Sequence, residues 1–228
     1  FDLAFGTVGL NFNEDTGQGV ADALAAPERL DDVLLDRLLI KSGDRLSLFA
    51  APALLDRDYD IENTAYEAVV DQVRRSIPCV MVDLPHAWTP WARQTLLGAD
   101  EIVLVATPDL ASLRNTKNML DVIRARRPND TPPKLVVNQT GMPKRPEIPI
   151  KEFAAAVDLQ PSLVLPFDPQ LFGTAANNGQ MIPEVQPAAP TSEGIRKLAG
   201  MITRRAVTHV SKKGKLSFLP FISNRKAG

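Results

Sequence analysis

The sequence has few of the residues that build disulfide frameworks and zinc sites. Its 228 residues include one cysteine, Cys79, and two histidines, His86 and His209. A single cysteine cannot form a disulfide within the chain, and the two histidines lie far apart in sequence, so a disulfide scaffold is excluded and a zinc site is poorly supported. This cysteine usage fits a reducing compartment, and we expect a cytoplasmic protein.

Long apolar runs are also missing. No stretch approaches the roughly 18 consecutive apolar residues of a membrane-spanning helix, and the first residues lack the basic, apolar and small-residue order of a signal peptide. The composition, 44% hydrophobic and 23% charged residues, is that of an ordinary globular chain. At this length we expect one domain with a full core.

Acidic residues are absent from the end of the chain. Nine Lys or Arg residues and no Asp or Glu lie between Gly194 and Gly228, which leaves 17 basic and 27 acidic residues before Gly194. We divide the chain into an α/β body, residues 1–210, and a basic tail, residues 211–228. In the tail, basic residues flank an apolar patch, so it is either a flexible solvated end or a segment that contacts an anionic membrane weakly.

Short apolar runs alternate with stretches of helical period, which is typical of βαβ units. The best strand candidates are residues 45–50, 79–84, 101–106, 134–138 and 162–166. Several are apolar almost throughout, as expected for parallel strands that are covered on both faces. The pattern therefore predicts a three-layer α/β sandwich with a mostly parallel central sheet.

The helical stretches have apolar residues at the spacing of one helix face. Three such faces are Leu30, Val33, Leu34 and Leu38; Tyr66, Val69, Val70 and Val73; and Ile150, Phe153, Ala154 and Val157. Asp109 is the expected N-cap of a helix that ends near Arg127, before Pro128, and a last helix is expected from about Ser192 to His209.

Polar residues follow several of these strands, and ligands of open parallel sheets bind beyond the carboxyl ends of the strands. Asp2 stands near the start of the chain, and Asp83 closes the apolar run CVMVD. A carboxylate in such a place suits Mg²⁺, which binds one or two hard oxygens beside phosphate and water. The alternative for Asp83 is a turn before Pro85.

Two further strand ends carry candidates for nucleobase contact. Asn138 ends the run KLVVN, and its amide offers both a donor and an acceptor to a base edge. Pro166, Phe167 and Asp168 lie where a strand turns into a helix, and this turn could lie against a base plane. The structural alternatives are a turn residue for Asn138 and a helix N-cap for Asp168.

In this order, the segments resemble the MinD/ParA class of deviant Walker ATPases, and within it the CpaE/TadZ pilus-assembly branch. The opening DLAFGTVGLNFN is similar to a motif after the second strand of that branch, and VMVDLPHAW is similar to its Walker B strand. The segment EIVLVATPDLASLRNTKNML resembles the following strand and helix, and LPFDPQLFGTAANNGQMI resembles the C-terminal nucleotide-contact segment. The resemblance extends to about Arg205.

The resemblance implies a P-loop NTPase topology that binds ATP and Mg²⁺. Asp2 would orient the attacking water or hold the magnesium shell, and Asp83 would be the Walker B carboxylate that holds Mg²⁺ through water. Asn138, Pro166, Phe167 and Asp168 would surround the adenine. The sequence departs from the family after Asn138, where Gln139 replaces the usual basic residue.

The phosphate-binding loop of the family has no counterpart here. No G-x-x-x-x-G-K-[ST] occurs in the 228 residues. On the resemblance, we expect that the first strand, the phosphate loop and the next helix precede Phe1 in the complete protein. Because charge neutralisation supports phosphoryl transfer, we expect this chain alone to bind ATP weakly or not at all and to be inactive.

The resemblance implies a homodimer that sandwiches ATP and positions pilus secretion machinery at the inner membrane or the cell pole. Arg114 and Lys117 would then face a partner, whereas the sequence alone favours an ordinary solvated helix face for them. Two alternatives remain: a scaffold of the same fold that does not hydrolyse ATP, and a chromosome or plasmid partition ATPase that binds DNA non-specifically. The acidity of the body argues against a broad DNA-binding face.

Overall fold

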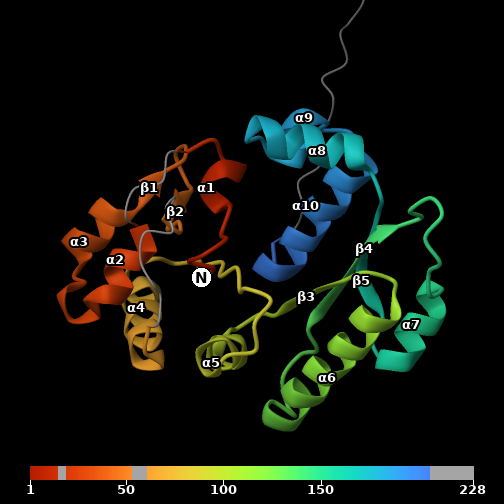
Figure 1. Ribbon diagram of the computed structural model, residues 1–228, viewed down its shortest axis with the longest axis horizontal. Coiled ribbons are helices and arrows are strands. Elements are labelled where there is room, and N and C mark those ends of the chain that lie inside the picture. Colours follow the sequence, from red (N-terminus) through yellow and green to blue (C-terminus); the bar gives the residue numbers. More distant parts are fainter. Residues whose placement is uncertain (15–18, 53–60, 206–228) are drawn as a thin grey trace, which may run out of the picture.

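The computed structural model describes residues 1–14, 19–52 and 61–205, and the predicted basic tail lies outside these ranges (Figure 1). The first elements are α1 (Val8–Asn11), α2 (Gly19–Ala25), a 3₁₀ helix (Pro27–Arg29), α3 (Asp32–Leu38), β1 (Ile40–Lys41), β2 (Ser47–Leu48), α4 (Asn63–Ser76) and α5 (Pro90–Gly98). Then follow β3 (Val103–Ala106), α6 (Leu110–Arg126), β4 (Lys134–Thr140), α7 (Ile150–Val157), β5 (Pro161–Pro166), α8 (Pro169–Asn178), α9 (Ile182–Val185) and α10 (Pro190–Thr203). None of the helices in these ranges has the length and apolar character needed to cross a bilayer.

The central sheet has the strand order β3-β4-β5, and both pairs are parallel. Val103 is in register with Lys134 and Ala106 with Val137, while Thr140 at the end of β4 is in register with Pro166. These three strands confirm the predicted runs 101–106, 134–138 and 162–166. Parallel strands need a crossover between them, and α6 and α7 supply it.

Helices cover both faces of this sheet. Figure 1 shows α6 and α7 on one side and α10 on the other. The main core joins Leu104, Leu135 and Val137 of the sheet to Leu120 of α6 and Phe153 of α7. On the opposite face α10 lies so close that a Cβ at Gly194 would meet the Leu163 side chain at 2.6 Å. The predicted three-layer α/β architecture is confirmed.

A second core lies in the first part of the chain. It is built by α2, α3, α4 and the start of α5 around Leu24, Leu35, Val69 and other buried residues. Tyr66 and Trp91 stack in this core with ring centroids 4.1 Å apart. Strands β1 and β2 form only a short antiparallel pair beside it.

Two predicted strands fail in this first part. Residues 79–84 form no strand, and of residues 45–50 only Ser47 and Leu48 do, in an antiparallel pair. A strand needs a neighbouring strand for its backbone N–H and C=O groups, and within the described ranges residues 79–84 pair with no strand and accept a backbone hydrogen bond only from Phe1 N. Met81 is accordingly 86% exposed, although Leu84 packs against both cores.

Two of the three predicted helix faces are confirmed, and the third is wrong in part, because Leu30 precedes α3 and Val33 is 61% exposed. The face of Tyr66, Val69 and Val73 lies in α4, and that of Phe153 and Val157 in α7. Asp109 caps α6 by accepting a hydrogen bond from Ser112 N at 2.9 Å, and α6 ends at Arg126, before Pro128. The last helix, α10, begins two residues before the predicted start, with Pro190 in its first turn, where the missing N–H costs nothing.

Candidate functional site

The carboxyl ends of β4 and β5 bring one predicted group of residues together. Thr140 Oγ1 donates to Leu165 O at 3.1 Å, and Phe167 N donates to Thr140 O at 2.8 Å. These bonds hold Asn138, two residues before Thr140, beside the turn that contains Pro166, Phe167 and Asp168. The half-buried Asn138 and Phe167 and the exposed Pro166 therefore lie along one edge of the sheet.

Asp168 is a helix N-cap at this edge. Its carboxylate accepts a hydrogen bond from Leu171 N at 2.9 Å and caps α8, whose first turn contains Pro169. The capping interpretation of Asp168 is therefore confirmed. A capped helix also fixes the direction of the backbone at Pro166 and Phe167, so the two interpretations are compatible.

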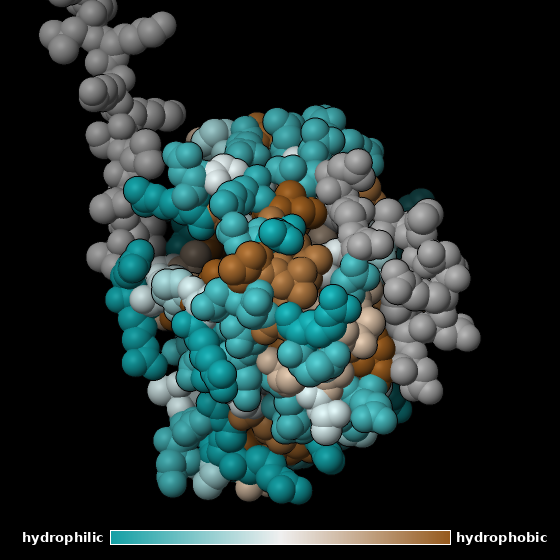
Figure 2. Space-filling model, turned by 90° about the vertical axis from the view of Figure 1, so that its left-hand side faces the viewer, coloured by the Kyte–Doolittle hydropathy of each residue, from teal (hydrophilic) through white to brown (hydrophobic). Residues whose placement is uncertain are grey.

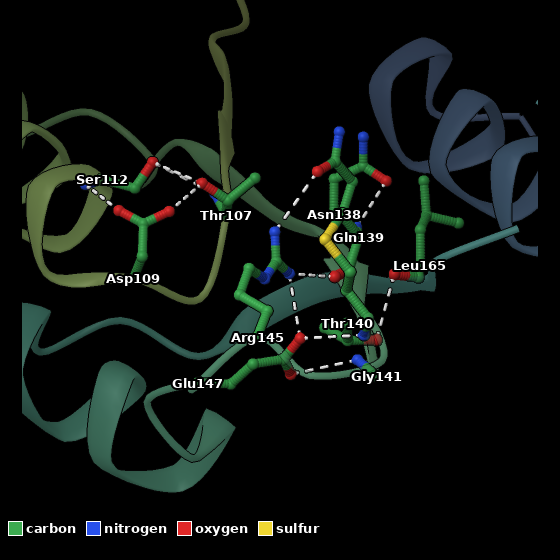
Figure 3. Close-up of polar contacts among 11 residues, drawn as sticks. Thr107, Asp109, Ser112, Asn138, Gln139, Thr140, Gly141, Arg145, Glu147 and Leu165 are labelled. Carbon is green, nitrogen blue, oxygen red and sulfur yellow. Dashed lines mark hydrogen bonds and ion pairs between the residues drawn. The ribbon is translucent and has the colours of Figure 1, made fainter. Parts of the chain in front are cut away.

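The end of β3 carries a polar cluster that sequence reasoning treated only as a helix cap. Thr107 Oγ1 donates to the Asp109 carboxylate and lies 3.1 Å from Ser112 Oγ. Hydrogen bonds from Ser112 N and then from Thr107 lower the pKa of Asp109 below its ordinary value of 3.8, so the carboxylate is ionised at neutral pH. The cluster lies on the same strand-end side as Asn138 (Figure 3).

The loop after β4 contains two functional candidates that the sequence analysis missed, Arg145 and Glu147. The Glu147 carboxylate accepts hydrogen bonds from Gly141 N at 3.0 Å, from Met142 N at 3.1 Å and from Arg145 Nη2 at 2.9 Å. The Gly141 N–H first, and Arg145 next, lower the pKa of Glu147 below 4.5. The available signal was a pair of opposite charges, RPE, shortly after the strand end at Asn138.

The other predicted pair, Asp2 and Asp83, lies together in the first part of the molecule. Phe1 N donates to Asp83 O at 2.5 Å, which places the first residues beside the segment 79–84. The Asp2 carboxylate accepts a hydrogen bond from Phe5 N at 3.0 Å, and Asp2 O accepts one from Gly6 N at 3.0 Å. A side chain at Gly6 would come within 2.3 Å of Asp2 O, so this turn requires glycine.

The Asp83 carboxylate is exposed and makes no side-chain hydrogen bond to a described residue, and the positive charge of the Phe1 ammonium group attracts it. An exposed carboxylate on an extended segment is a ligand that Mg²⁺ would take through water. The described residues contain no group of three or more His, Cys, Asp or Glu that could hold a metal directly. The donor set therefore fits a water-mediated Mg²⁺ contact and does not fit a tightly bound structural metal.

The predicted site residues thus form two groups. Asn138, Pro166, Phe167 and Asp168 lie at the edge of the sheet, while Asp2 and Asp83 lie on the side of the second core. Across residues 1–14, 19–52 and 61–205, no hydrogen bond or ion pair joins the two groups. The first group places an amide and an aromatic ring at one edge of the sheet, and the second places two carboxylates beside the second core.

Comparison with known proteins supports the fold and leaves the branch open. No protein-family model matches the chain. A septum site-determining protein MinD from Synechocystis sp. is 23% identical over 96 residues, which are 42% of this chain and 36% of that protein. The match therefore spans only about a third of that relative.

Solved structures match over most of the chain. A ParA family ATPase from Chlorobium tepidum TLS superposes with a TM-score of 0.71 at 23% identity, over 85% of this chain and 79% of that one. The MinD protein from Pyrococcus horikoshii OT3, complexed with Mg-ADP, superposes with a TM-score of 0.74 at 17% identity, over 88% and 80%. The chain has the α/β fold of the MinD/ParA ATPases.

Proposed function

We propose that this chain is a nucleotide-responsive positioning protein of the MinD/ParA type. The observation that carries the proposal is the edge where β4 and β5 end, because it joins Asn138 to the turn of Pro166, Phe167 and Asp168 in a fold shared with these ATPases. Asn138 offers a hydrogen-bonding amide to a purine, and Phe167 offers an apolar surface to its ring. The ligand would be ATP with Mg²⁺.

The two aspartates would act on the phosphate side. Asp83 would hold Mg²⁺ through a water molecule, with its exposed carboxylate. Asp2 accepts from Phe5 N with Oδ1, which leaves Oδ2 to orient a water molecule. When bound, Mg²⁺ would neutralise charge on the phosphates, and these residues would position it.

The biological role that we propose is Flp/Tad-type pilus assembly. Its support is the resemblance of the opening DLAFGTVGLNFN and of LPFDPQLFGTAANNGQMI to the CpaE/TadZ branch. We propose that the protein acts as a homodimer in the cytoplasm and places the pilus secretion machinery at the inner membrane or the cell pole. Loss of the gene in its host is expected to remove or misplace pili and leave septum placement unchanged; a septum defect with normal pili would contradict this role.

A scaffold of the same fold that does not hydrolyse ATP is the second candidate. The observation that favours it is the departure from the family after Asn138, where Gln139 stands in place of the usual basic residue and removes a positive charge from the expected nucleotide site. Measuring ATP turnover and ATP-dependent dimerisation of the complete protein beside its Asp83→Ala variant separates the two. Both activities should fall in the variant if the protein is a switch, whereas nucleotide binding without turnover in either chain supports the scaffold.

Nucleotide binding itself can be tested on this chain by titrating Mg-ADP into ¹⁵N-labelled protein to millimolar concentration. We expect amide shifts to gather at residues 138–141 and 166–168. Asn138→Ala should weaken binding by about threefold to tenfold, the usual worth of one hydrogen bond. Asn115→Ala, on α6, is the matched control and should change nothing. Shifts that gather elsewhere, or equal effects of the two variants, would refute the site.

A further inference from the structure

The turn at the end of β4 has an unusual backbone. Gln139 has a φ of 59°, in the left-handed region that non-glycine residues rarely adopt, and Gly141 has a φ of 75°. Such a conformation persists only where the surroundings hold it. Gln139 follows Asn138 directly, so whatever holds Gln139 also decides how Asn138 is presented.

Arg145 is the residue that holds Gln139. Its Nη2 donates to Gln139 O, and its Nη1 donates to Gln139 Oε1 at 3.3 Å (Figure 3). The same guanidinium donates to Glu147, which in turn accepts from Gly141 N and Met142 N. One arginine and one glutamate therefore bind three residues of the turn, Gln139, Gly141 and Met142.

The backbone turn at Gln139 decides which atoms of the Asn138 amide are available to a ligand. Gln139 N donates to Asn138 Oδ1 at 2.8 Å, which engages the amide oxygen. The amide nitrogen, Nδ2, has no partner among the residues that the structure describes. Asn138 therefore presents N–H donors at the edge of the sheet, and a ligand must offer an acceptor to this position.

The arrangement is not the most stable use of an arginine. Arg145 Nε is buried and has no hydrogen-bond partner in the described part of the chain. A buried donor without a partner costs stability, so packing alone gives no reason for an arginine here. The hold on Gln139 does give one.

We propose that Arg145 is a positioning residue for nucleobase recognition: by holding Gln139 in its left-handed turn, it keeps the Asn138 amide N–H directed to an acceptor nitrogen of a purine ring. This inference rests on the proposed function, since it says whether Asn138, at the same edge of the sheet, donates or accepts the hydrogen bond to the base. It adds the requirement that the preferred ligand has a ring acceptor, which adenosine has and one of its deaza analogues lacks.

The test compares adenosine with 7-deazaadenosine, 3-deazaadenosine and 1-deazaadenosine, each titrated into ¹⁵N-labelled chain. In the unmodified protein, one of the three analogues should bind about fivefold to tenfold more weakly than adenosine, because one hydrogen bond is lost. In Arg145→Met that ratio should fall below about twofold, since Asn138 can then rotate. Arg145→Lys keeps the positive charge but cannot donate to both Gln139 O and Gln139 Oε1 as the guanidinium does. It should give an intermediate ratio.

Arg124→Met is the matched control. Arg124 Nη2 also binds backbone carbonyls, Val157 O at 3.1 Å and Asp158 O at 2.8 Å, but these lie at the end of α7. Its loss should lower stability and leave the adenosine-to-deaza ratio unchanged. A general loss of structure would move both variants alike, so the ratio separates positioning from stability.

Failure of the Arg145 proposal and failure of the nucleobase edge give different results. If Arg145→Met keeps the ratio of the unmodified chain, the Arg145 proposal is wrong and the nucleobase edge survives. If adenosine shifts no amide near Asn138 in the unmodified chain, the nucleobase edge itself is wrong, and the role of Arg145 falls with it. Equal binding of adenosine and all three analogues to the unmodified chain would show that Asn138 contacts no ring acceptor, and the Arg145 proposal would then be wrong.

Discussion

The two cores of this molecule are built from similar apolar residues, yet only one of them contains a parallel sheet. Around the second core, β1 and β2 contribute two residues each, and residues 79–84 stay unpaired. Around the main core, β3, β4 and β5 pair in register. The sequence pattern of residues 79–84, CVMVDL, is as strand-like as that of residues 101–106, EIVLVA. A β pattern therefore becomes a strand only where a neighbouring backbone is present.

Apolar side chains are exposed near both cores. Figure 2, which faces the left-hand side of Figure 1, has brown apolar surface near its centre among polar groups. Exposed apolar side chains in the first part of the chain include Phe5, Leu10, Val33 and Met81. Val103 and Val105 of β3 are also exposed, at 37% and 66%, and β3 pairs with one described strand only. Apolar side chains are thus exposed both in the first part of the chain and on β3.

The largest expected difference between the two regions is in amide hydrogen exchange. The amides of Val136 and Val137 lie in the middle strand and should be protected on the order of a thousandfold or more, near the limit of global unfolding. The amides of Val80 to Asp83 have no acceptor among the described residues and should exchange within about tenfold of the unfolded rate. Exchange measured by NMR checks this. Equal protection in both segments would show that residues 79–84 are paired in solution.

A pair of leucines provides the next comparison, because each is buried on a helix of one core. Leu120 of α6 is 1% exposed and packs on the sheet, while Leu35 of α3 is 2% exposed and packs among helices. Leu120→Ala should cost about 4 kcal/mol and Leu35→Ala about 2 kcal/mol, because a site against a rigid sheet relaxes less around the cavity. Urea denaturation measures both free energies of unfolding. A larger loss for Leu35→Ala would reverse the assignment of the more rigid core.

Sequence reasoning succeeded where local rules decide the outcome. The periodic faces of α4 and α7, the cap at Asp109 and the three paired strands are determined within short segments, and all were predicted. It also placed Asn138 and Asp168 at the strand ends, since parallel strands end on one edge. Pairing partners are not encoded in the segment itself, so residues 79–84 were assigned wrongly.

Arg145 and Glu147 were missed for a related reason. Their role comes from a loop that turns back on Gln139, and the left-handed φ of Gln139 is not signalled by its residue type. Glutamine is an ordinary residue on a strand or helix, whereas asparagine or glycine would have marked the turn. The contact between Arg145 and the turn could be found only with the fold in hand.

The smallest expected effect concerns acid pH and two helix caps, Asp109 at the start of α6, which packs on the main core, and Asp31 at the start of α3, which packs on the second core. The pKa of Asp109 is lowered in the folded protein, so its stabilising contribution is complete above its ordinary value of 3.8 and is lost as the pH falls through the lowered folded value. Asp109→Asn should therefore reduce stability by less than about 1 kcal/mol at pH 7, and the difference should shrink as the pH falls below 3.8.

Asp31→Asn is the matched substitution, because Asp31 caps α3 by accepting from Leu34 N at 2.7 Å and lacks a threonine donor such as Thr107. Urea titrations of both variants between pH 2 and pH 7 measure the effect. Because Asp109 accepts a hydrogen bond from Thr107 Oγ1 and Asp31 accepts none from a threonine among the described residues, the pH-dependent part of the loss should be larger for Asp109→Asn. Equal pH profiles would mean that Thr107 adds nothing to the cap, and the polar cluster at the end of β3 would then be an ordinary helix start.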